Sequence, residues 1–335
     1  MKIERVLGVG NALTDILVNL SDETLLEQFS LPKGGMTLLT AEQQSLISKS
    51  VEGLDKTLSL GGSAGNTIRA MAYLGSQVAL MGKVGRDSTG DYFFEALQQR
   101  GITPYIYRGE SDSGRCLSLI TEDGERTMAT YLGAALELCD EEYTNEVFNG
   151  YDTLYVEGYL VQNHSLISKL MNRAKSAGLN VAIDLASYNV VEENLDFLQE
   201  LVSDYVDIIF ANEDEARVFT SHSEPMDALY TLSQLCQVAV VKIGEKGALI
   251  KSGEQIIHTG ILTEAKRVDT TGAGDYFAAG FLSAMCAGLP MQQCGTLGAV
   301  AAGRVIETVG TTLSSETWSD ILAKYQLIKS GDYML

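Results

Sequence analysis

The sequence is poor in proline, histidine and basic residues. Only 4 prolines stand beside 33 glycines in 335 residues, a balance that suits tight backbone turns rather than extended linkers. The 3 histidines share no metal-ligand spacing and the 5 cysteines form no CxxC pair, so we expect buried free thiols and a reducing compartment. With 24 lysines and arginines against 44 aspartates and glutamates, the net charge is −20. This charge argues against nucleic acid and anionic membranes as partners, because both repel an acidic chain.

Long hydrophobic runs are also missing. The apolar run at residues 6–10 is too short for a secretory signal, and the longest near-apolar stretch, residues 276–291, falls short of a membrane span. We therefore expect a cytoplasmic protein. Its length suits two domains or one large domain with an insertion. Hydrophobic residues at 45% and charged residues at 20% supply a sizeable core and exclude intrinsic disorder.

Short apolar segments alternate with helical patterns along the chain. The β-rich runs lie at residues 6–9, 78–84, 153–156, 181–183, 208–210 and 238–243, and helical patterns between or after them include residues 165–177, 226–236 and 276–285. This alternation predicts an α/β fold: a doubly wound, mostly parallel sheet flanked by helices on both faces.

One region breaks this alternation and predicts a lid. Residues 116–120 and 127–131 flank an Asp123-Gly124 pair, which indicates a β-hairpin turn. No internal repeat or Pro-rich linker separates the hairpin from its surroundings. We expect one main domain, residues 1–335, with a small β-strand lid built from about residues 14–38 and 103–132.

The most informative segment is Asp269-Thr270-Thr271-Gly272-Ala273-Gly274-Asp275, which precedes an apolar helical pattern. Small residues allow backbone amides to approach a ligand, and the start of a helix favours an anion. A carboxylate at the mouth of such a site suits a general base that takes a proton from an attacking hydroxyl. The alternative is a glycine-rich turn in which Asp275 caps the helix. Composition alone does not separate the two.

Four segments together resemble the PfkB (ribokinase-like) family of sugar and nucleoside kinases. Residues 269–280 resemble its second fingerprint, and residues 61–66, with Gly75 and Gly85, resemble its first. Ile68 departs from the small or hydroxyl residue common in the first fingerprint. Residues 212–215 resemble the family's Asn-x-x-Glu element, and residues 242–247 its nucleotide-side strand and turn. The segments occur in family order, which implies a ribokinase-like fold and an ATP-dependent kinase.

The resemblance implies a catalytic centre and an acceptor site. It implies that Asp275 is the catalytic base and that the amides of Gly272, Ala273 and Gly274 form an anion hole. The positions that match the family's contacts to the acceptor are Asn11, Asp15, Gly61, Gly62 and Asn66. From the residues alone, Asn11 and Asp15 could equally be a turn residue and a surface or capping acid.

The resemblance also implies nucleotide and metal sites. Its nucleotide side comprises Asn212, Lys242, Gly244, Gly247 and Thr270. Mg²⁺ is expected as Mg-ATP, with Glu215 acting through water; the alternative is an acid on a helix surface. Many relatives need a monovalent cation such as K⁺ near the anion hole, and Asp269 and Thr271 match positions used there.

The sequence leaves two possible roles for each of two residues, Arg126 and Tyr159. Residues 125–135 resemble adenosine kinases and their bacterial relatives more than typical ribokinases. Arg126, on the second lid strand, could swing over the transferring phosphate, or it could be a solvated hairpin charge. Tyr159 follows a strand end, where it could stack on a base or belong to the core.

These observations predict an ATP-dependent kinase that phosphorylates a primary hydroxyl of a nucleoside, preferably adenosine. A free sugar or sugar acid is the alternative acceptor, and the protein is a monomer or a homodimer through the lid. A nicotinamide-dependent dehydrogenase is disfavoured, because Leu13 takes the place of the third glycine after Gly8-Val9-Gly10 and Asp15 would crowd the pyrophosphate. An inactive nucleotide sensor is disfavoured by the intact Asp275 and its glycine-rich loop.

Overall fold

The computed structural model describes residues 3–123 and 125–335. In these residues the main sheet has nine strands in the order β14-β13-β12-β11-β10-β9-β1-β5-β6. The seven strands from β12 to β6 are parallel, and β13 and β14 are antiparallel additions at one edge. The bounds are β1 (Arg5–Val9), β5 (Gln77–Val84), β6 (Thr103–Arg108), β9 (Thr153–Glu157), β10 (Asn180–Asp184), β11 (Ile208–Asn212), β12 (Val238–Lys242), β13 (Ala248–Ser252) and β14 (Gln255–Thr259).

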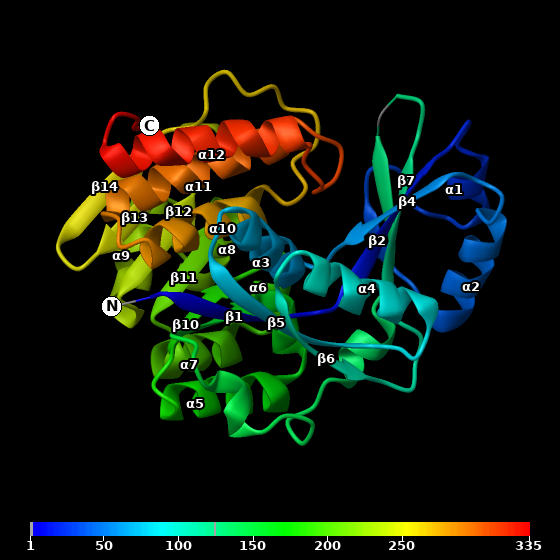
Figure 1. Cartoon of the computed structure of the whole chain (residues 1–335), viewed down its shortest axis with the longest axis horizontal. Helices are drawn as coiled ribbons and strands as arrows, with labels where there is room; N and C mark the ends of the chain where they lie inside the picture. Colours follow the sequence, from blue (N-terminus) through cyan, green and yellow to red (C-terminus); the bar gives the residue numbers. More distant parts are fainter. Residues whose placement is uncertain (1–2, 124) are drawn as a thin grey trace.

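Helices cover both faces of this sheet, as the sequence predicts (Figure 1). Side chains of successive strand residues point to opposite faces, so Val6 belongs to one buried cluster and Leu7 to the other. The Val6 face is covered by α3 (Ser63–Tyr73), α4 (Ser88–Gln99), α10 (Ala273–Cys286) and α11 (Met291–Val305), and α12 (Ser315–Ser330) packs on α11. The Leu7 face is covered by α5 (His164–Ser176), α6 (Tyr188–Glu193), α7 (Leu195–Tyr205), α8 (Glu213–Thr220) and α9 (Pro225–Leu235). The doubly wound α/β prediction is confirmed.

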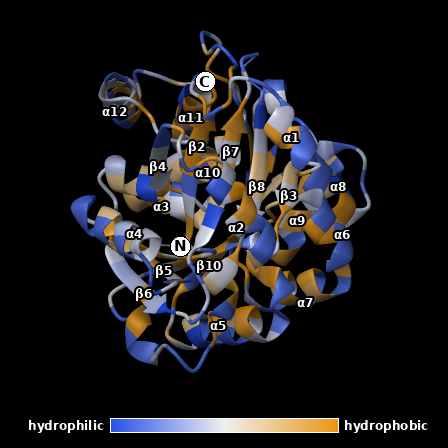
Figure 2. Cartoon of the chain, turned by 90° about the vertical axis from the view of Figure 1, so that its right-hand side faces the viewer, coloured by the Kyte–Doolittle hydropathy of each residue, from blue (hydrophilic) through white to orange (hydrophobic). Residues whose placement is uncertain are grey.

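The α10 helix lies deepest among these helices. Its residues 276–285 are all buried, since the helix packs against α3 and α11 and its Phe281 contacts Phe210 of β11. Figure 2 shows the corresponding apolar colouring of α10 and α11 in the interior. A helix that is apolar nearly all round must be buried, so the start of α10 is held rigidly against the sheet.

A second sheet of five strands, here called the lid sheet, lies to one side of the main body (Figure 1). Its order is β3 (Met36–Leu38), β8 (Arg126–Tyr131), β7 (Gly114–Ile120), β2 (Leu13–Asn19) and β4 (Lys56–Leu60). The short helices α1 (Thr24–Gln28) and α2 (Ala41–Ser50) pack on it around a small core that includes Val18, Ile47 and Leu117.

The predicted hairpin is confirmed as β7 and β8, which pair antiparallel. Gly124 of the predicted Asp123-Gly124 turn lies outside the described residues. The predicted lid boundaries need two corrections. Residues 103–108 form β6, which pairs with β5 in the main sheet, and residues 56–60 form β4, which pairs with β2 in the lid sheet. Both strands are short and at most half-buried over much of their length, so their pairing depends on distant partners rather than on local pattern.

All five cysteines carry free thiols, as predicted, but only Cys116 and Cys294 are fully buried. Among residues 3–123 and 125–335, no helix combines the length and the apolar character that crossing a membrane requires.

Candidate active site at the carboxyl ends of the parallel strands

Polar residues gather where the parallel strands end. Asn11 follows β1, while Glu157, Asp184, Asn212 and Lys242 are the last residues of β9, β10, β11 and β12. Parallel strands end at the same edge of a sheet, so these residues share one edge, where α/β proteins bind their ligands. The first turns of α3 and α10 close against this edge.

Asp275 lies in the first turn of α10 and faces α3. Its Oδ1 accepts a 2.7 Å hydrogen bond from Ser63 Oγ, and its Oδ2 accepts a 2.9 Å bond from Asn66 Nδ2. Gly272 is the N-cap residue of α10, and no side chain caps this helix, which removes the capping alternative for Asp275. Burial raises the pKa of Asp275 to about 6, although the bonds from Ser63 and Asn66 lower it. A carboxylate of this pKa is ionised at neutral pH and still basic enough to accept a proton.

The predicted anion hole is the start of α10. Gly272 has φ +77°, a backbone conformation that favours glycine, and Ala273 and Gly274 follow it in the first turn. The first amides of a helix have no partner within the helix and carry its positive end. A Cβ atom on Gly274 would lie 3.1 Å from Lys242 Nζ, so an ammonium group stands beside these amides. Together they form a local positive site in a chain of net charge −20.

Lys242 is held at this place by Asp184. The Nζ of Lys242 lies 2.7 Å from Asp184 Oδ2, and both side chains are largely buried. Burial lowers the pKa of Lys242, but the carboxylates of Asp184 and Glu215 raise it by more, so the ammonium stays charged. Sequence reasoning missed Asp184, whose only signal is an acid that ends a buried strand.

Two glycines shape the turn before α3, where the sequence predicts contacts to the acceptor. A Cβ atom on Gly61 would collide with the carboxylate of Asp15, and one on Gly62 would collide with the carbonyl oxygen of Asn11. Gly62 also has φ +78° and precedes α3 as its N-cap. The turn before α3 therefore packs directly on the loop after β1. It brings Asp15 and Asn66, both buried, to the same site.

Glu157 is a second buried acid that sequence reasoning did not assign. Its Oε1 accepts hydrogen bonds from the backbone and side-chain nitrogens of Asn11, at 3.3 and 2.8 Å, and its Oε2 accepts a 2.9 Å bond from the amide of Ala64. Burial raises its pKa to about 7. Glu157 thus joins the loop after β1 to the first turn of α3. The signal that could have found it is again an acid closing an apolar strand.

The predicted nucleotide residues lie at the ends of β11 and β12. Asn212 caps α8: its Oδ1 accepts from the amide of Glu215 at 2.9 Å, and Glu215 returns the contact by accepting from Asn212 N at 2.7 Å and Nδ2 at 2.6 Å. Glu215 is only 2% exposed, so the alternative of a surface acid is wrong. Gly244 and Gly247, with φ +59° and +94°, form the turn between β12 and β13, and Thr270 lies exposed before the anion hole.

Arg126 reaches from the lid sheet to the loop before α10. Its Nη1 donates a 3.0 Å hydrogen bond to Asp269 Oδ2 and its Nε donates to Ser118 at 3.0 Å. The side chain is 8% exposed, so Arg126 is not a solvated hairpin charge. Asp269 also accepts from the amide and hydroxyl of Thr271 on Oδ1 and from the amide of Gly310 on Oδ2. The lid sheet is therefore closed onto this loop by an ion pair.

A cavity of about 400 Å³ lies beside Asn11. Leu136 and Tyr159 line it, Leu136 being 57% exposed and Tyr159 half-buried against the core. Both apolar and polar side chains line the cavity, as in many small-molecule sites. The other lining residues are Ala135, Leu160, Gln162, Asn163, His164 and Leu166.

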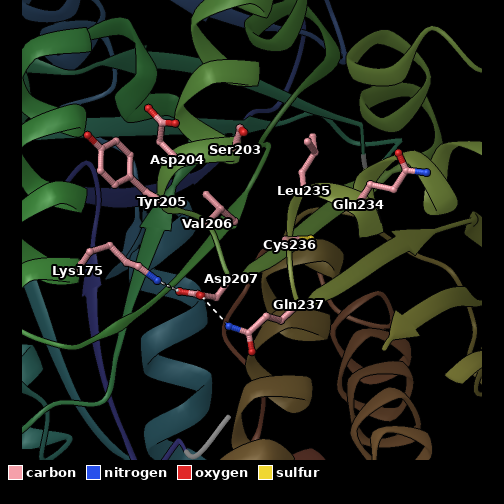
Figure 3. Close-up of a pocket in the computed structure, with 10 residues that line it drawn as sticks. All are labelled: Lys175, Ser203, Asp204, Tyr205, Val206, Asp207, Gln234, Leu235, Cys236 and Gln237. Atoms are coloured by element: carbon pink, nitrogen blue, oxygen red, sulfur yellow. Dashed lines mark hydrogen bonds and ion pairs between the residues drawn. The ribbon is translucent and has the colours of Figure 1, made fainter. Parts of the chain in front are cut away.

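Another cavity, of about 290 Å³, lies at the opposite edge of the sheet (Figure 3). Asp207 precedes β11 there and accepts from Lys175 Nζ at 2.7 Å and from Gln237 Nε2 at 3.0 Å. These three side chains pair with one another, and Asp207 and Gln237 lie at the amino ends of β11 and β12. This cavity is separate from the site at the carboxyl ends.

Within the part of the chain that the structure describes, no group of three or more His, Cys, Asp or Glu side chains is arranged to hold a metal ion.

Known proteins are similar to this chain over most of its length. The model of the pfkB family carbohydrate kinases matches residues 36–318, a range that contains the predicted site residues apart from Asn11 and Asp15. The crystal structure of adenosine kinase from Sinorhizobium meliloti is similar with a TM-score of 0.84 and 32% identity, over 97% of this chain and 100% of that chain. A probable sugar kinase from Rhizobium etli CFN 42 is similar with a TM-score of 0.84 and 31% identity, over 99% and 100%. Adenosine kinase from Schizophyllum commune is 28% identical over 337 residues, covering 92% of this chain and 97% of that protein.

Proposed function

Because the chain belongs to the pfkB family of carbohydrate kinases, we propose that it transfers the γ-phosphoryl group of ATP to a primary hydroxyl of a nucleoside, with adenosine preferred. The observation that carries this proposal is the position of Asp275. Its carboxylate lies in the first turn of α10, beside the first amides of the helix and across from the acceptor-side residues Ser63 and Asn66.

The transfer follows from this arrangement. Asp275 takes the proton of the acceptor hydroxyl, whose oxygen forms a bond to the γ-phosphorus while the bond from that phosphorus to the β–γ bridging oxygen breaks. ADP leaves with the electron pair of the broken bond. The amides of Gly272, Ala273 and Gly274 and the ammonium of Lys242 hold the negative oxygens of the transferring group. Phosphoryl transfer depends mostly on such positioning and charge stabilisation.

The acceptor side offers hydroxyl partners and a space for a base. Asp15, Asn11 and Asn66 supply the acceptors and donors that ribose hydroxyls need. The cavity beside Asn11 is large enough for a flat ring, and Tyr159 and Leu136 supply apolar contacts to it. A free sugar would leave this cavity empty. The adenosine kinases among the similar proteins support the same choice.

Mg²⁺ fits the nucleotide side as part of Mg-ATP. Each carboxylate oxygen of Glu215 accepts one hydrogen bond from Asn212, so each retains a lone pair for a metal-bound water. When bound, the ion supplies neutralisation of the phosphate charge. Asn212 and Glu215 would then hold the Mg-ATP complex. Thr270, Gly244 and Gly247 shape the backbone around it.

A monovalent cation does not fit the carboxylate of Asp269 in this arrangement. The carboxylate accepts from Arg126, Gly310 and twice from Thr271, which uses its four lone-pair sites. A cation at this carboxylate would have to displace one of these donors. The guanidinium of Arg126, which pairs with Asp269 three residues before Gly272, supplies positive charge to the loop that leads into the anion hole.

An ADP-release assay with Mg-ATP tests the proposal across adenosine, inosine, ribose, fructose and a keto-deoxy sugar acid. We expect the highest kcat/KM with adenosine. Highest turnover with a free sugar would keep the chemistry and refute the nucleoside acceptor. Absence of turnover across the panel, with ATP binding retained, would contradict kinase activity on these acceptors.

A further inference from the structure

Arg69 is a buried cation that the proposed mechanism does not use. It lies on α3 and is 2% exposed. Its Nη1 donates a 2.6 Å hydrogen bond to the carbonyl of Leu60, and its Nη2 donates to Asn66 Oδ1 at 3.1 Å and to the carbonyl and hydroxyl oxygens of Thr311 at 2.6 and 2.8 Å. In the part of the chain that the structure describes, all these hydrogen-bond partners are neutral. Arg69 also acts electrostatically on the buried carboxylate of Asp15: burial raises the pKa of that group, and the charge of Arg69 lowers it. A buried guanidinium whose hydrogen bonds go to neutral groups is costly, which raises the question of what it does there.

Asn66 is the link between Arg69 and Asp275. Its Oδ1 accepts from Arg69 Nη2 and, at 3.0 Å, from Thr311 Oγ1, while its Nδ2 donates to Asp275 Oδ2 at 2.9 Å. An amide side chain has one accepting end and one donating end, whereas a guanidinium can only donate. Arg69 therefore requires the oxygen of Asn66 on its own side. The NH₂ group must then face Asp275.

We propose that Arg69 is a positioning residue of the active site: it fixes the orientation of the Asn66 amide, so that Asn66 donates a hydrogen bond to Asp275. The inference rests on the proposed function in treating Asp275 as the base. Without Arg69, the Asn66 amide could turn over and place its oxygen against the carboxylate of Asp275. That arrangement would favour the protonated acid, because only an O–H could then bridge the two oxygens.

The other contacts of Arg69 join its helix, α3, to the end of β4 and to the loop after α11. Leu60 ends β4 directly before Gly61, and Thr311 lies in the loop after α11, where its carbonyl also accepts a 2.7 Å bond from Tyr276 OH. Arg69 thus also stabilises the packing of these segments. A test must separate this structural contribution from the orientation of Asn66, and the protonation of Asp275 does so.

Other ionisable groups also face Asp275. They come from the ends of three strands, from the 3₁₀ turn at residues 158–162 and from α10 itself: Lys242, Asp184, Tyr155, Glu157, Tyr159 and Tyr276. Glu157, with a pKa of about 7, titrates close to Asp275. Variants at Asn66 are needed to assign the effect to the amide.

The experiment measures the titration of Asp275 directly. Carbon-13 NMR of the aspartate carboxyl carbons gives its pKa, with the signal assigned by comparison with Asp275→Asn. Arg69→Met, which keeps the length of the side chain and removes its donors, should raise this pKa by about one unit or more, the effect of losing a hydrogen bond to a charged group. Arg69→Lys keeps a charged donor and should restore a value near that of the wild type. In an Asn66→Ala background, Arg69→Met should produce no further change.

Two readouts accompany the titration. The acidic limb of kcat/KM should move to higher pH in Arg69→Met by the same amount. Trp318, the single tryptophan, stacks on Tyr276 with ring centroids 5.9 Å apart, so its fluorescence reports whether the start of α10 has kept its packing. Should Arg69→Met fail to fold, Thr311→Val removes the other donor to Asn66 Oδ1 and should raise the pKa of Asp275 in the same direction.

The outcomes are distinct. An unchanged titration of Asp275 in a folded Arg69→Met or Thr311→Val variant, with only a lower melting temperature, would overturn the positioning role. So would the same increase in pKa in the Asn66→Ala background. Because the NMR titration needs no turnover, a wild-type protein that phosphorylates no acceptor would refute the proposed function alone.

Discussion

The Nζ of Lys242 lies 2.7 Å from Asp184 Oδ2 and directly beside Gly274 at the start of α10. Asp184 and Lys242 end strands on either side of β11, so the sheet itself sets their separation. The ion pair places one fixed positive charge where the helix amides point. That charge offsets the surrounding acids, Asp275 and Glu215 included.

Removing this charge should impair catalysis more than binding. We expect Lys242→Met to lower kcat by about 10²–10³, the loss typical of one donor in an oxyanion hole. Lys175 provides a matched control, because its Nζ also lies 2.7 Å from an aspartate, Asp207, at the opposite edge of the sheet. Lys175→Met should keep kcat. Equal losses in the two variants would show that Lys242 contributes only to stability.

The pH dependence of activity should report Asp275. Because burial raises its pKa to about 6, kcat/KM should be nearly constant above pH 7 and fall about tenfold per pH unit well below pH 6, as the base becomes protonated. Steady-state kinetics between pH 5 and pH 8 measure this limb, with coupling enzymes in excess at each pH. A limb near pH 4, the ordinary range of an aspartate, would contradict the buried base.

The raised pKa of Asp275 also affects stability. Activity should increase as pH rises through this pKa, whereas the contribution of Asp275 to stability should decrease. The folded protein holds the proton of Asp275 up to about pH 6, whereas the unfolded chain loses it near pH 3.8. Between these values the folded state binds more protons, so the contribution of Asp275 to stability decreases as pH rises. Denaturant unfolding should show Asp275→Asn gaining stability relative to the wild type between pH 4 and pH 6.5. A difference that stays constant with pH would refute the raised pKa.

Turnover should not depend on K⁺. Arg126 already occupies the carboxylate of Asp269, so replacing K⁺ by a large organic cation should leave the rate of the wild type essentially unchanged. Arg126→Met removes this guanidinium and frees a lone pair of Asp269 Oδ2. The variant should be slower and should gain stimulation by K⁺. Strong stimulation of the wild type would show that the cation displaces Arg126 or binds elsewhere.

The cavity beside Asn11 makes a prediction about the acceptor. Leu136 is 57% exposed, so Leu136→Ala should leave the melting temperature nearly unchanged. We expect KM for adenosine to rise about tenfold, within the range for lost apolar contacts in a substrate pocket. KM for ATP should stay constant and serves as the internal control. An unchanged KM for adenosine would place the base outside this cavity.

Local pattern was sufficient to predict the hairpin, the glycine-rich loop and the buried strands β1, β5, β9, β10, β11 and β12. It was not sufficient to predict the other strands or the pairings made across the sheet. The buried apolar runs at β1, β9, β10 and β12 are continuous, so their periodicity identifies them. Asp184 and Glu157 look like ordinary strand-end acids until the sheet brings Lys242 and Asn11 beside them. Their roles depend on partners 58 and 146 residues away along the chain.

The contacts of two arginines could not be predicted for the same reason. Arg126 pairs with Asp269, 143 residues later, and Arg69 contacts Thr311, 242 residues later. Nothing adjacent to either arginine in the sequence indicates these partners. The lid boundaries were misplaced for the same reason, because β4 and β6 find their sheets through β2 and β5 rather than through their own pattern.

The most direct test of the account is the turnover of Asp275→Asn with Mg-ATP and the best acceptor. The side chain keeps its shape but cannot take the proton of the hydroxyl. We expect kcat to fall by at least about 10² while ATP affinity, measured by titration calorimetry, stays near that of the wild type. Near-normal turnover in this variant would contradict the assignment of Asp275 as the base and, with it, the proposed mechanism.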